Sequence, residues 1–255
     1  MQRTRISNLI FSCSVAVVSL IPNQSFGWGK DGHAAIVRLA FQLMPPAQRE
    51  RLYAILDTTD PYYIGNWADW IARKEYPESK PWHYVDIPPD ATEYVASRDC
   101  KDDCILSELP LLEQELKKKR LSFAKRREDM LYYFHFLGDL YQPFHTLGPT
   151  GATDLFVKWH GERTNMHRVW DENIILDHDI DTISLLKLAC TMQSEPLETD
   201  YAKIAMEGHR VAVQNLVDPG IRLPNNYSDQ KWPIVEHALI EAALLIVAKT
   251  KDMRT

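Results

Sequence analysis

The stretch His135-Phe-Leu-Gly-Asp139-Leu-Tyr-Gln-Pro-Phe-His145, followed by His167-Arg-Val-Trp-Asp171, sets five side chains that can bind a metal at helical and near-helical spacings. Residues four apart on a helix project from one face with Cβ atoms roughly 5–6 Å apart, so His135 pairs with Asp139 and His167 pairs with Asp171. Imidazole nitrogen and carboxylate oxygen are ligands that zinc accepts at about 2.0–2.2 Å. The two pairs therefore predict a buried zinc cluster.

Pro143 determines where the helix carrying the first pair ends. Proline lacks an amide hydrogen and disfavours helical geometry at the residue before it, which is Gln142. We therefore expect this helix to end near Gln142 and the following turn to bring His145 back toward the pair as a third ligand.

Apolar residues recur at helical intervals along most of the chain, and few segments alternate with period two. With 255 residues, 45% of them hydrophobic, the chain can bury one sizeable core. These patterns predict an all-α fold, a single mainly helical domain in which Asp31 caps the first helix. Residues 153–163 are expected to form at most a short β-hairpin with its bend at Trp159-His160-Gly161. Helices are expected over 34–43, 47–56, 108–118, 124–141, 182–192, 201–216 and 233–249.

The first 27 residues differ in composition from the rest. Arg3 and Arg5 form a basic start, residues 9–21 are mostly apolar, and Ser25-Phe26-Gly27 offers small residues for cleavage. The apolar run of about 13 residues is shorter than the roughly 20 that a spanning helix needs. We therefore predict a signal peptide over 1–27 that is cleaved near Gly27, and a secreted or periplasmic domain over 28–255 with no membrane attachment. The short leader suits a bacterial protein.

Cleavage after Gly27 would make Trp28 the amino terminus. A free α-amine has a pKa near 7.7 that a metal can depress, so Trp28 is a candidate ligand through its amine. The alternative is that Trp28 only anchors the first helix in the core, which is the commoner role of tryptophan.

Cysteine usage agrees with export. Cys100 and Cys104 are close enough to form a small disulfide loop in an oxidising compartment, with zinc binding by the pair as the weaker alternative. Cys190 follows an apolar stretch and is expected to be a buried structural thiol. Among the histidines outside the paired spacings, His237 is expected on a buried helix face.

The net charge argues against broad clamping of a nucleic-acid duplex. Without Arg3 and Arg5 the chain has 27 basic and 35 acidic residues, a formal net charge of −8, whereas a protein that tracks phosphates is usually basic. Bound metal ions reverse the local sign. Three zinc ions would bring six positive charges to one cleft, so local capture of a phosphodiester remains compatible with the composition.

Further motifs complete a resemblance to a known family. The chain resembles the secreted zinc-dependent S1/P1 nucleases, which cut single strands, and the plant bifunctional nucleases from Trp28 to near the C-terminus. The resemblance rests on Trp28 with His33, Trp67-Ala68-Asp69, Trp82-His83-Tyr84-Val85-Asp86, the 135–145 stretch, and Thr164-Asn165-Met166-His167 through Trp170-Asp171.

The resemblance implies a fold and a trinuclear zinc site of the phospholipase C and nuclease type. One zinc would be held by Asp69, His83, His135 and Asp139, a second by His145, His167 and Asp171, and a third by Trp28, His33 and a bridging Asp139. It also implies hydrolysis of single-stranded DNA or RNA to 5′-phosphates, and a 3′-nucleotidase activity. Separately, we expect the chain to be a monomer.

The resemblance also implies roles at the substrate. Asp69 would help to orient the attacking water, while Tyr84 and Asp86 would form a pocket that stacks and hydrogen-bonds a base; plain packing and capping are the alternative. Arg73 or Lys74, a turn after Asp69, is a candidate contact for phosphate or simply a solvated charge. Where the family usually has Gly-Gly-Asn, this chain has Gly151-Ala152-Thr153. We therefore expect Thr153 to alter the substrate contact that the asparagine makes.

Two other functions fit parts of the pattern. A zinc-dependent phospholipase C is similar in its N-terminal tryptophan and His-x3-Asp-x5-His core, but that family typically has a glutamate where Asp171 stands. A secreted zinc-binding protein that has lost turnover would keep the ligands and show the change at Thr153. Hydrolysis of denatured DNA compared with that of phosphatidylcholine separates these alternatives.

Overall fold

The computed structural model describes residues 28–192 and 195–253, and the predicted signal peptide lies outside them. The described chain is mainly helical with one two-stranded antiparallel sheet, as predicted. No helix in these ranges is both long enough and apolar enough to span a bilayer. The elements are α1 Gly29–Leu43, α2 Pro46–Leu56, α3 Pro61–Trp67, η1 Ala68–Ala72, α4 Arg73–Glu75, η2 Pro77–His83, α5 Ala96–Asp99, α6 Ile105–Leu116, α7 Phe123–Asp139, η3 Pro143–Thr146, β1 Phe156–Trp159, β2 Glu162–Asn165, α8 Met166–Arg168, η4 Val169–Asn173, α9 Ile174–Asp177, α10 Thr182–Met192, α11 Tyr201–Gln214 and α12 Tyr227–Thr250.

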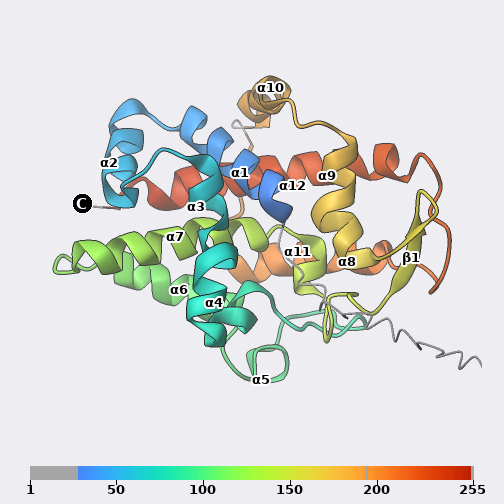
Figure 1. Cartoon of the computed structure of the whole chain (residues 1–255). Coiled ribbons are helices and arrows are strands. Elements are labelled where there is room, and N and C mark those ends of the chain that lie inside the picture. Colours follow the sequence, from blue (N-terminus) through green and yellow to red (C-terminus); the bar gives the residue numbers. More distant parts are fainter. Residues whose placement is uncertain (1–27, 193–194, 254–255) are drawn as a thin grey trace, which may run out of the picture.

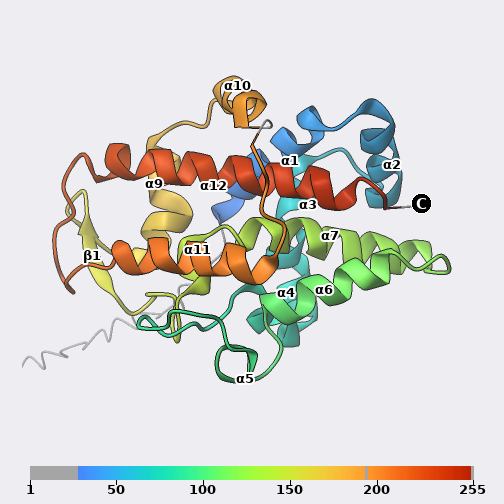
Figure 2. The same cartoon turned by 180° about the vertical axis from the view of Figure 1, so that it is seen from behind.

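Helix α7 lies at the centre of the fold, packed against α3, α6, α2 and α12 (Figures 1 and 2). Its residues 129–139 are all buried, because apolar side chains lie on every face of this part of the helix rather than on one stripe. Helix α1 packs between α3 and α12, and α11 packs against η3. The segments that carry the predicted ligands therefore surround the C-terminal end of α7.

The C-terminal helix α12 is tied to α2 by side-chain hydrogen bonds. Gln48 Nε2 donates to Val247 O at 2.9 Å and to Thr250 Oγ1 at 2.9 Å. Helix α12 begins at Tyr227, six residues before the predicted start at Pro233. Its first turn is anchored by Trp170, whose Nε1 donates to the hydroxyl of Tyr227 at 3.3 Å.

The predicted hairpin forms with its bend at the predicted residues. Strands β1 and β2 pair from Phe156 with Asn165 to Trp159 with Glu162. His160 and Gly161 have φ angles of 46° and 95°, and positive φ at both central residues is what the tightest hairpin turns require. The second strand ends at Asn165, whose side chain accepts a hydrogen bond from Arg168 N at 2.8 Å and caps α8.

Three expectations were wrong. Helix α1 begins at Gly29, so Asp31 lies within its first turn instead of capping it, and accepts a hydrogen bond from the hydroxyl of Tyr62. Cys190 is exposed, because α10 buries only Leu185 and Ala189 and the next position turns away from that stripe. His237 is also exposed, with 55% of its side-chain surface accessible. The Cys100–Cys104 disulfide is present as predicted.

Candidate metal centre

Eight histidine and aspartate side chains from seven segments converge at the C-terminal end of α7. Each is at most 6% exposed, although charged and imidazole groups are rarely buried without partners. Helix α7 carries two of them, and α1, η1, η2, η3, α8 and η4 carry one each. They are His33, Asp69, His83, His135, Asp139, His145, His167 and Asp171.

The carboxylate of Asp139 lies at the centre of this cluster and faces histidines on both sides. Its Oδ2 is 2.9 Å from His83 Nδ1 and 3.0 Å from His135 Nε2. Its Oδ1 is 3.2 Å from His33 Nε2. Ligands bound tetrahedrally at about 2.1 Å are roughly 3.4 Å apart, so these spacings suit one carboxylate shared between two ions.

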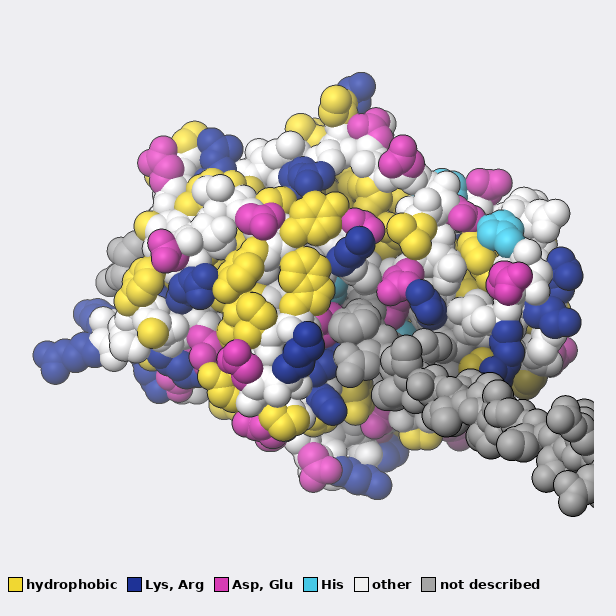
Figure 3. Space-filling view, viewed as in Figure 1, with side chains coloured by type: hydrophobic (Ala, Val, Ile, Leu, Met, Phe, Trp, Pro, Cys, Tyr) yellow, Lys and Arg dark blue, Asp and Glu magenta, His cyan; other side chains and the backbone are white. Residues whose placement is uncertain are grey.

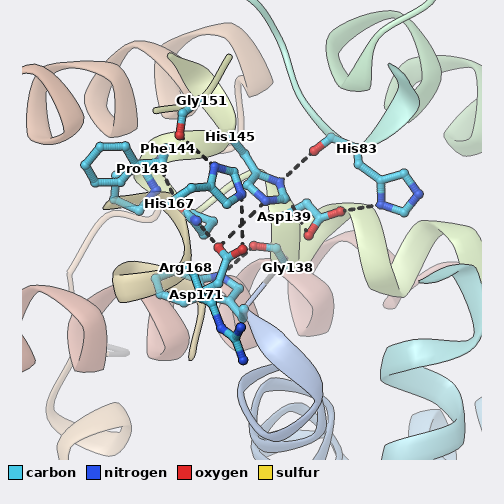
Figure 4. Close-up of polar contacts among 12 residues, drawn as sticks. His83, Gly138, Asp139, Pro143, Phe144, His145, Gly151, His167, Arg168 and Asp171 are labelled. Carbon is cyan, nitrogen blue, oxygen red and sulfur yellow. Dashed lines mark hydrogen bonds and ion pairs between the residues drawn. The ribbon is translucent and has the colours of Figure 1, made fainter. Parts of the chain in front are cut away.

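A second group lies beside the first, in the part of the site that Figure 4 shows. His167 Nε2 is 3.1 Å from Asp171 Oδ2, and His145 Nε2 is 3.9 Å from Asp171 Oδ1. The rings of His145 and His167 are stacked with centroids 5.1 Å apart. His145 Nδ1 is 3.6 Å from Asp139 Oδ1, so the two groups are continuous.

Backbone carbonyls orient three of the imidazoles. The Nδ1 atoms of His135, His145 and His167 lie 2.6, 2.8 and 2.7 Å from carbonyl oxygens, to which they donate in the appropriate tautomer. The remaining nitrogen then faces the cluster as an acceptor, the form that binds a metal. The carbonyls belong to Gly65, His83 and Gly151.

Two glycines make these contacts possible. A Cβ at Gly65 would lie 2.8 Å from the carbonyl oxygen of His33. Gly151 has a φ of +57°, and a Cβ there would lie 2.8 Å from His167 Nδ1. Any other residue at either position would push a histidine away from the cluster.

Burial and neighbouring charges move the pKa values of the cluster in opposite directions. Burial lowers the pKa of His145 to about 3 and raises that of Asp171 to about 7. Burial also opposes charge on His135, but the carboxylates of Asp139 and Asp69 raise its pKa to about 9. The pKa of Asp139 is lowered well below its ordinary value because His135 and His145 outweigh its burial. Burial therefore favours the neutral forms of His145 and Asp171, whereas neighbouring opposite charges favour the charged forms of His135 and Asp139.

Several buried atoms of the cluster have no hydrogen-bond partner among the described residues. They include Nε2 of His33 and His167, both carboxylate oxygens of Asp69, and Oδ1 of Asp139. Leaving such a group unsatisfied costs about 1–3 kcal/mol, and native proteins contain few. A set of imidazole and carboxylate donors with unused lone pairs fits divalent zinc. Three groups bring their ligand atoms within 4.8 Å of one another: His33 with His135 and Asp139, Asp69 with His83 and His135, and His145 with His167 and Asp171.

The structure thus brings eight of the nine predicted ligand residues into one cluster. The ninth, Trp28, is fully buried at the start of α1, and its Nε1 donates to Gly138 O at 2.9 Å. The indole therefore anchors this end of α1 beside Asp139. The predicted role of the Trp28 amine depends on the cleavage of residues outside the described range.

The predicted substrate residues line a single cavity of about 340 Å³ beside the cluster, together with His83, His145 and His167. Tyr84 is 37% exposed there, and burial raises the pKa of Asp86. Arg73 Nη1 lies 3.4 Å from Asp69 Oδ1, and Thr153 Oγ1 donates to Thr150 O at 2.9 Å. We call this the Tyr84 cavity; its lining includes Arg73, Tyr84, Asp86 and Thr153.

Sequence reasoning missed the part played by Gln142 and by two local distortions. The Gln142 side-chain amide donates to Asp171 Oδ1, so this residue positions a candidate ligand. Its side-chain oxygen also accepts a hydrogen bond from Phe144 N and caps η3. The only sequence feature that singled out Gln142 was its position directly before Pro143. Asp69 and Asp171 both lie in single-turn π-helices, η1 and η4, which commonly mark functional sites and which no spacing rule foretells.

Known proteins resemble this chain along most of its length. The S1/P1 Nuclease family model matches residues 28–248. Endonuclease 4 of Arabidopsis thaliana is 25% identical over 92% of this chain and 91% of its own length. Endonuclease 2 of the same plant is 30% identical over 61% of this chain and 58% of its own length. Nuclease S1 of Aspergillus oryzae is 28% identical over 59% of this chain and 55% of its own length.

Proposed function

The chain belongs to the S1/P1 nuclease family and is therefore a nuclease, and we propose that residues 28–255 form a zinc-dependent domain that cuts single-stranded DNA and RNA. The observation that carries this proposal is the convergence of eight buried histidines and aspartates, several of whose buried ligand atoms form no hydrogen bond among the described residues. Residues 1–27 would be the export signal of a secreted or periplasmic monomer. Hydrolysis of 3′-nucleotides would be a second activity of the same site.

We assign three zinc ions to the cluster. The first would be held by Asp69, His83, His135 and Asp139, the second by His145, His167 and Asp171, and the third by His33, Asp139 and the amine and carbonyl oxygen of Trp28. The two-sided contacts of the Asp139 carboxylate support its assignment to two ions. Bound divalent cations supply Lewis-acid polarisation of the phosphoryl group and neutralise the charge that develops during its hydrolysis.

The protein's own groups position the reactants. Water adds to phosphorus and the bond from phosphorus to the 3′ oxygen breaks, so that the 3′ oxygen leaves as a hydroxyl and the product carries a 5′-phosphate. Asp69 would orient the water through its buried carboxylate. This carboxylate is paired with Arg73, whose Nη1 lies 3.4 Å from Asp69 Oδ1. The guanidinium of Arg73 also lines the Tyr84 cavity, where it can meet a phosphate oxygen.

The Tyr84 cavity supports a preference for single strands. A base can stack on the partly exposed ring of Tyr84, and the carboxylate of Asp86 can accept hydrogen bonds from the exocyclic or ring N–H groups of that base. Stacking of this kind contributes on the order of 1–3 kcal/mol per base. A base in a duplex must first be unpaired and unstacked, which costs a few kcal/mol, so a single strand is the better substrate.

Metal content measured together with product analysis tests the proposal. The purified mature protein should contain three zinc ions and should convert denatured DNA to fragments with 5′-phosphates faster than it cuts duplex DNA. Hydrolysis of phosphatidylcholine in place of DNA would indicate a phospholipase C. Full zinc with no turnover of DNA, RNA or 3′-nucleotides would indicate a zinc-binding protein without catalysis.

A further inference from the structure

A second cavity of about 340 Å³ adjoins the cluster and shares no lining residue with the Tyr84 cavity. Trp28 and Asp171 belong to its lining, whereas His83, His145 and His167 line the Tyr84 cavity. Since His167 Nε2 is 3.1 Å from Asp171 Oδ2, one layer of candidate metal ligands separates the two cavities. We call this second space the Trp70 cavity; its lining includes Trp28, Lys30, Asn66, Trp70, Asp171 and Ile175.

Trp70 gives this cavity an exposed aromatic wall. It directly follows Asp69 in η1, yet Asp69 is 2% exposed and Trp70 is 40% exposed. The Trp70 ring makes no hydrogen bond or ring contact with the residues that the structure describes, although tryptophan is normally buried. Figure 3 shows hydrophobic side chains gathered over α3 and η1 with basic groups beside them. A large exposed ring at the edge of a phosphodiesterase site is a surface on which a base can stack.

The charges of the Trp70 cavity leave one cation available. Asp31 accepts a hydrogen bond from the Tyr62 hydroxyl at 3.0 Å, and Glu172 is paired with Arg168 at 2.9 Å. Lys30 lines the cavity, is exposed, and forms no ion pair within residues 28–192 and 195–253. A phosphate that enters the cavity would therefore meet the ammonium group of Lys30. Of the three acidic side chains in the lining, Asp31 and Glu172 are held by Tyr62 and Arg168, and Asp171 is a candidate metal ligand beside His167.

The frame around these groups is fixed by backbone contacts. Asn66 Nδ2 donates to Lys30 O at 3.1 Å and to Tyr62 O at 2.9 Å, which ties α1 to α3. A Cβ at Gly29 would lie 3.1 Å from Asp171 O, so the start of α1 packs directly on η4. The backbone segments that carry Trp70, Lys30 and the candidate ligand Asp171 are therefore held together around the cavity.

We propose that the Trp70 cavity is a second nucleotide subsite, in which a base stacks on Trp70 and the adjoining phosphate meets Lys30. The inference rests on the proposed nuclease function. The substrate strand then runs from the Tyr84 cavity across the metal centre to the Trp70 cavity, with one nucleoside on each side of the phosphodiester that is cleaved. A volume of about 340 Å³ lies at the lower end of the range for ligand pockets and suits one nucleoside.

The test compares Trp70→Ala with the parent protein on two substrates. Oligo(dT) uses both cavities, whereas bis(p-nitrophenyl) phosphate, a small phosphodiester, reports the metal centre without a second nucleoside. For Trp70→Ala we expect KM for oligo(dT) to rise and the ratio of kcat/KM on oligo(dT) to that on the small substrate to fall roughly tenfold, the loss of one stacked base. Trp70→Phe should restore most of that ratio.

Phe123→Ala is the matched control, because Phe123 is an exposed aromatic residue, 57% accessible, at the far end of α7. It should leave the ratio unchanged. An unchanged ratio in Trp70→Ala, or equal losses on both substrates with loss of zinc, would overturn the subsite. A parent protein that cleaves the small diester but no nucleic acid would instead refute the proposed nuclease specificity, so the two failures are distinguishable.

Discussion

Replacing Asp139 with asparagine tests the metal assignment most directly. The carboxylate lies 2.9 Å from His83 Nδ1, 3.0 Å from His135 Nε2 and, through its other oxygen, 3.2 Å from His33 Nε2. Asp139→Asn keeps the shape of the side chain but removes its charge and one of its two acceptor oxygens. We therefore expect it to disturb two ions at once.

The size of the effect follows from what those ions contribute. Metal ions supply several kcal/mol of charge stabilisation in phosphoryl hydrolysis, and each factor of ten in rate corresponds to about 1.4 kcal/mol. A loss of about 4 kcal/mol gives a fall of roughly a thousandfold in kcat/KM. Zinc content should fall from three toward one per chain, with His145, His167 and Asp171 retaining their ion.

Asp129→Asn is the matched control, because Asp129 lies on the same helix and is equally buried at 1% exposure, but pairs with Lys125 at 2.7 Å, away from the cluster. It should lower stability without reducing zinc content. His160→Ala, at an exposed imidazole beside Asp177, should be nearly silent. Zinc is measured by atomic absorption and kcat/KM on denatured DNA. If Asp139→Asn kept full zinc and lost no more activity than Asp129→Asn, the ligand assignment would be refuted.

Extra residues before Trp28 in the mature protein should remove roughly one zinc ion in three, because the α-amine would be tied up in a peptide bond; full zinc and activity in such a protein would contradict the role of that amine. Protein with zinc at about 100 times the dissociation constant should melt roughly 5–10 °C above protein from which a chelator has removed the zinc. Identical melting curves for the two samples would argue against a metal within the buried cluster. The carboxylate of Glu113 accepts hydrogen bonds from Lys117 Nζ and the Tyr201 hydroxyl, both at 2.6 Å. Burial opposes its ionisation, but Lys117, Tyr201 and Lys249 lower its pKa from 4.5 to about 2. The ionised Glu113 carboxylate therefore contributes fully to the free energy of unfolding above pH 4.5, and this contribution is lost as the pH falls toward 2. Glu113→Gln should lower the free energy of unfolding by about 1–3 kcal/mol at pH 7 and by much less near pH 2. An equal loss at both pH values in urea unfolding would contradict the assigned role of this carboxylate.

The periodic parts of the fold were predictable from the sequence. Helix α10 has the predicted bounds, Thr182–Met192, and the hairpin bends at His160 and Gly161, because a repeating apolar stripe and a glycine-containing turn are local signals. Helix ends were less predictable. Helix α12 begins six residues before Pro233, where a tertiary contact between Trp170 and Tyr227 outweighs the local helix-breaking signal.

Exposure within a helix was also beyond local reasoning. Cys190 and His237 were expected inside and lie outside, since an apolar neighbourhood in sequence does not specify which side of a helix meets the core. The same limit applies to Trp70, whose exposure beside buried Asp69 depends on the π-helical turn of η1 and on the packing of α3 against α1.

By itself the sequence determined which chemistry is available: histidine and aspartate at i, i+4 spacing, a proline that follows the central helix within one turn, and a chain that is mostly helical. Only the tertiary structure decided that residues as distant as His33 and Asp171 share one buried cluster, that Asp139 faces histidines on both sides, and that two separate cavities flank the candidate ligands. The reason is that side-chain spacing within one helix is set by local backbone geometry. The meeting of separate segments depends instead on burial of their shared apolar surface, which local patterns do not encode.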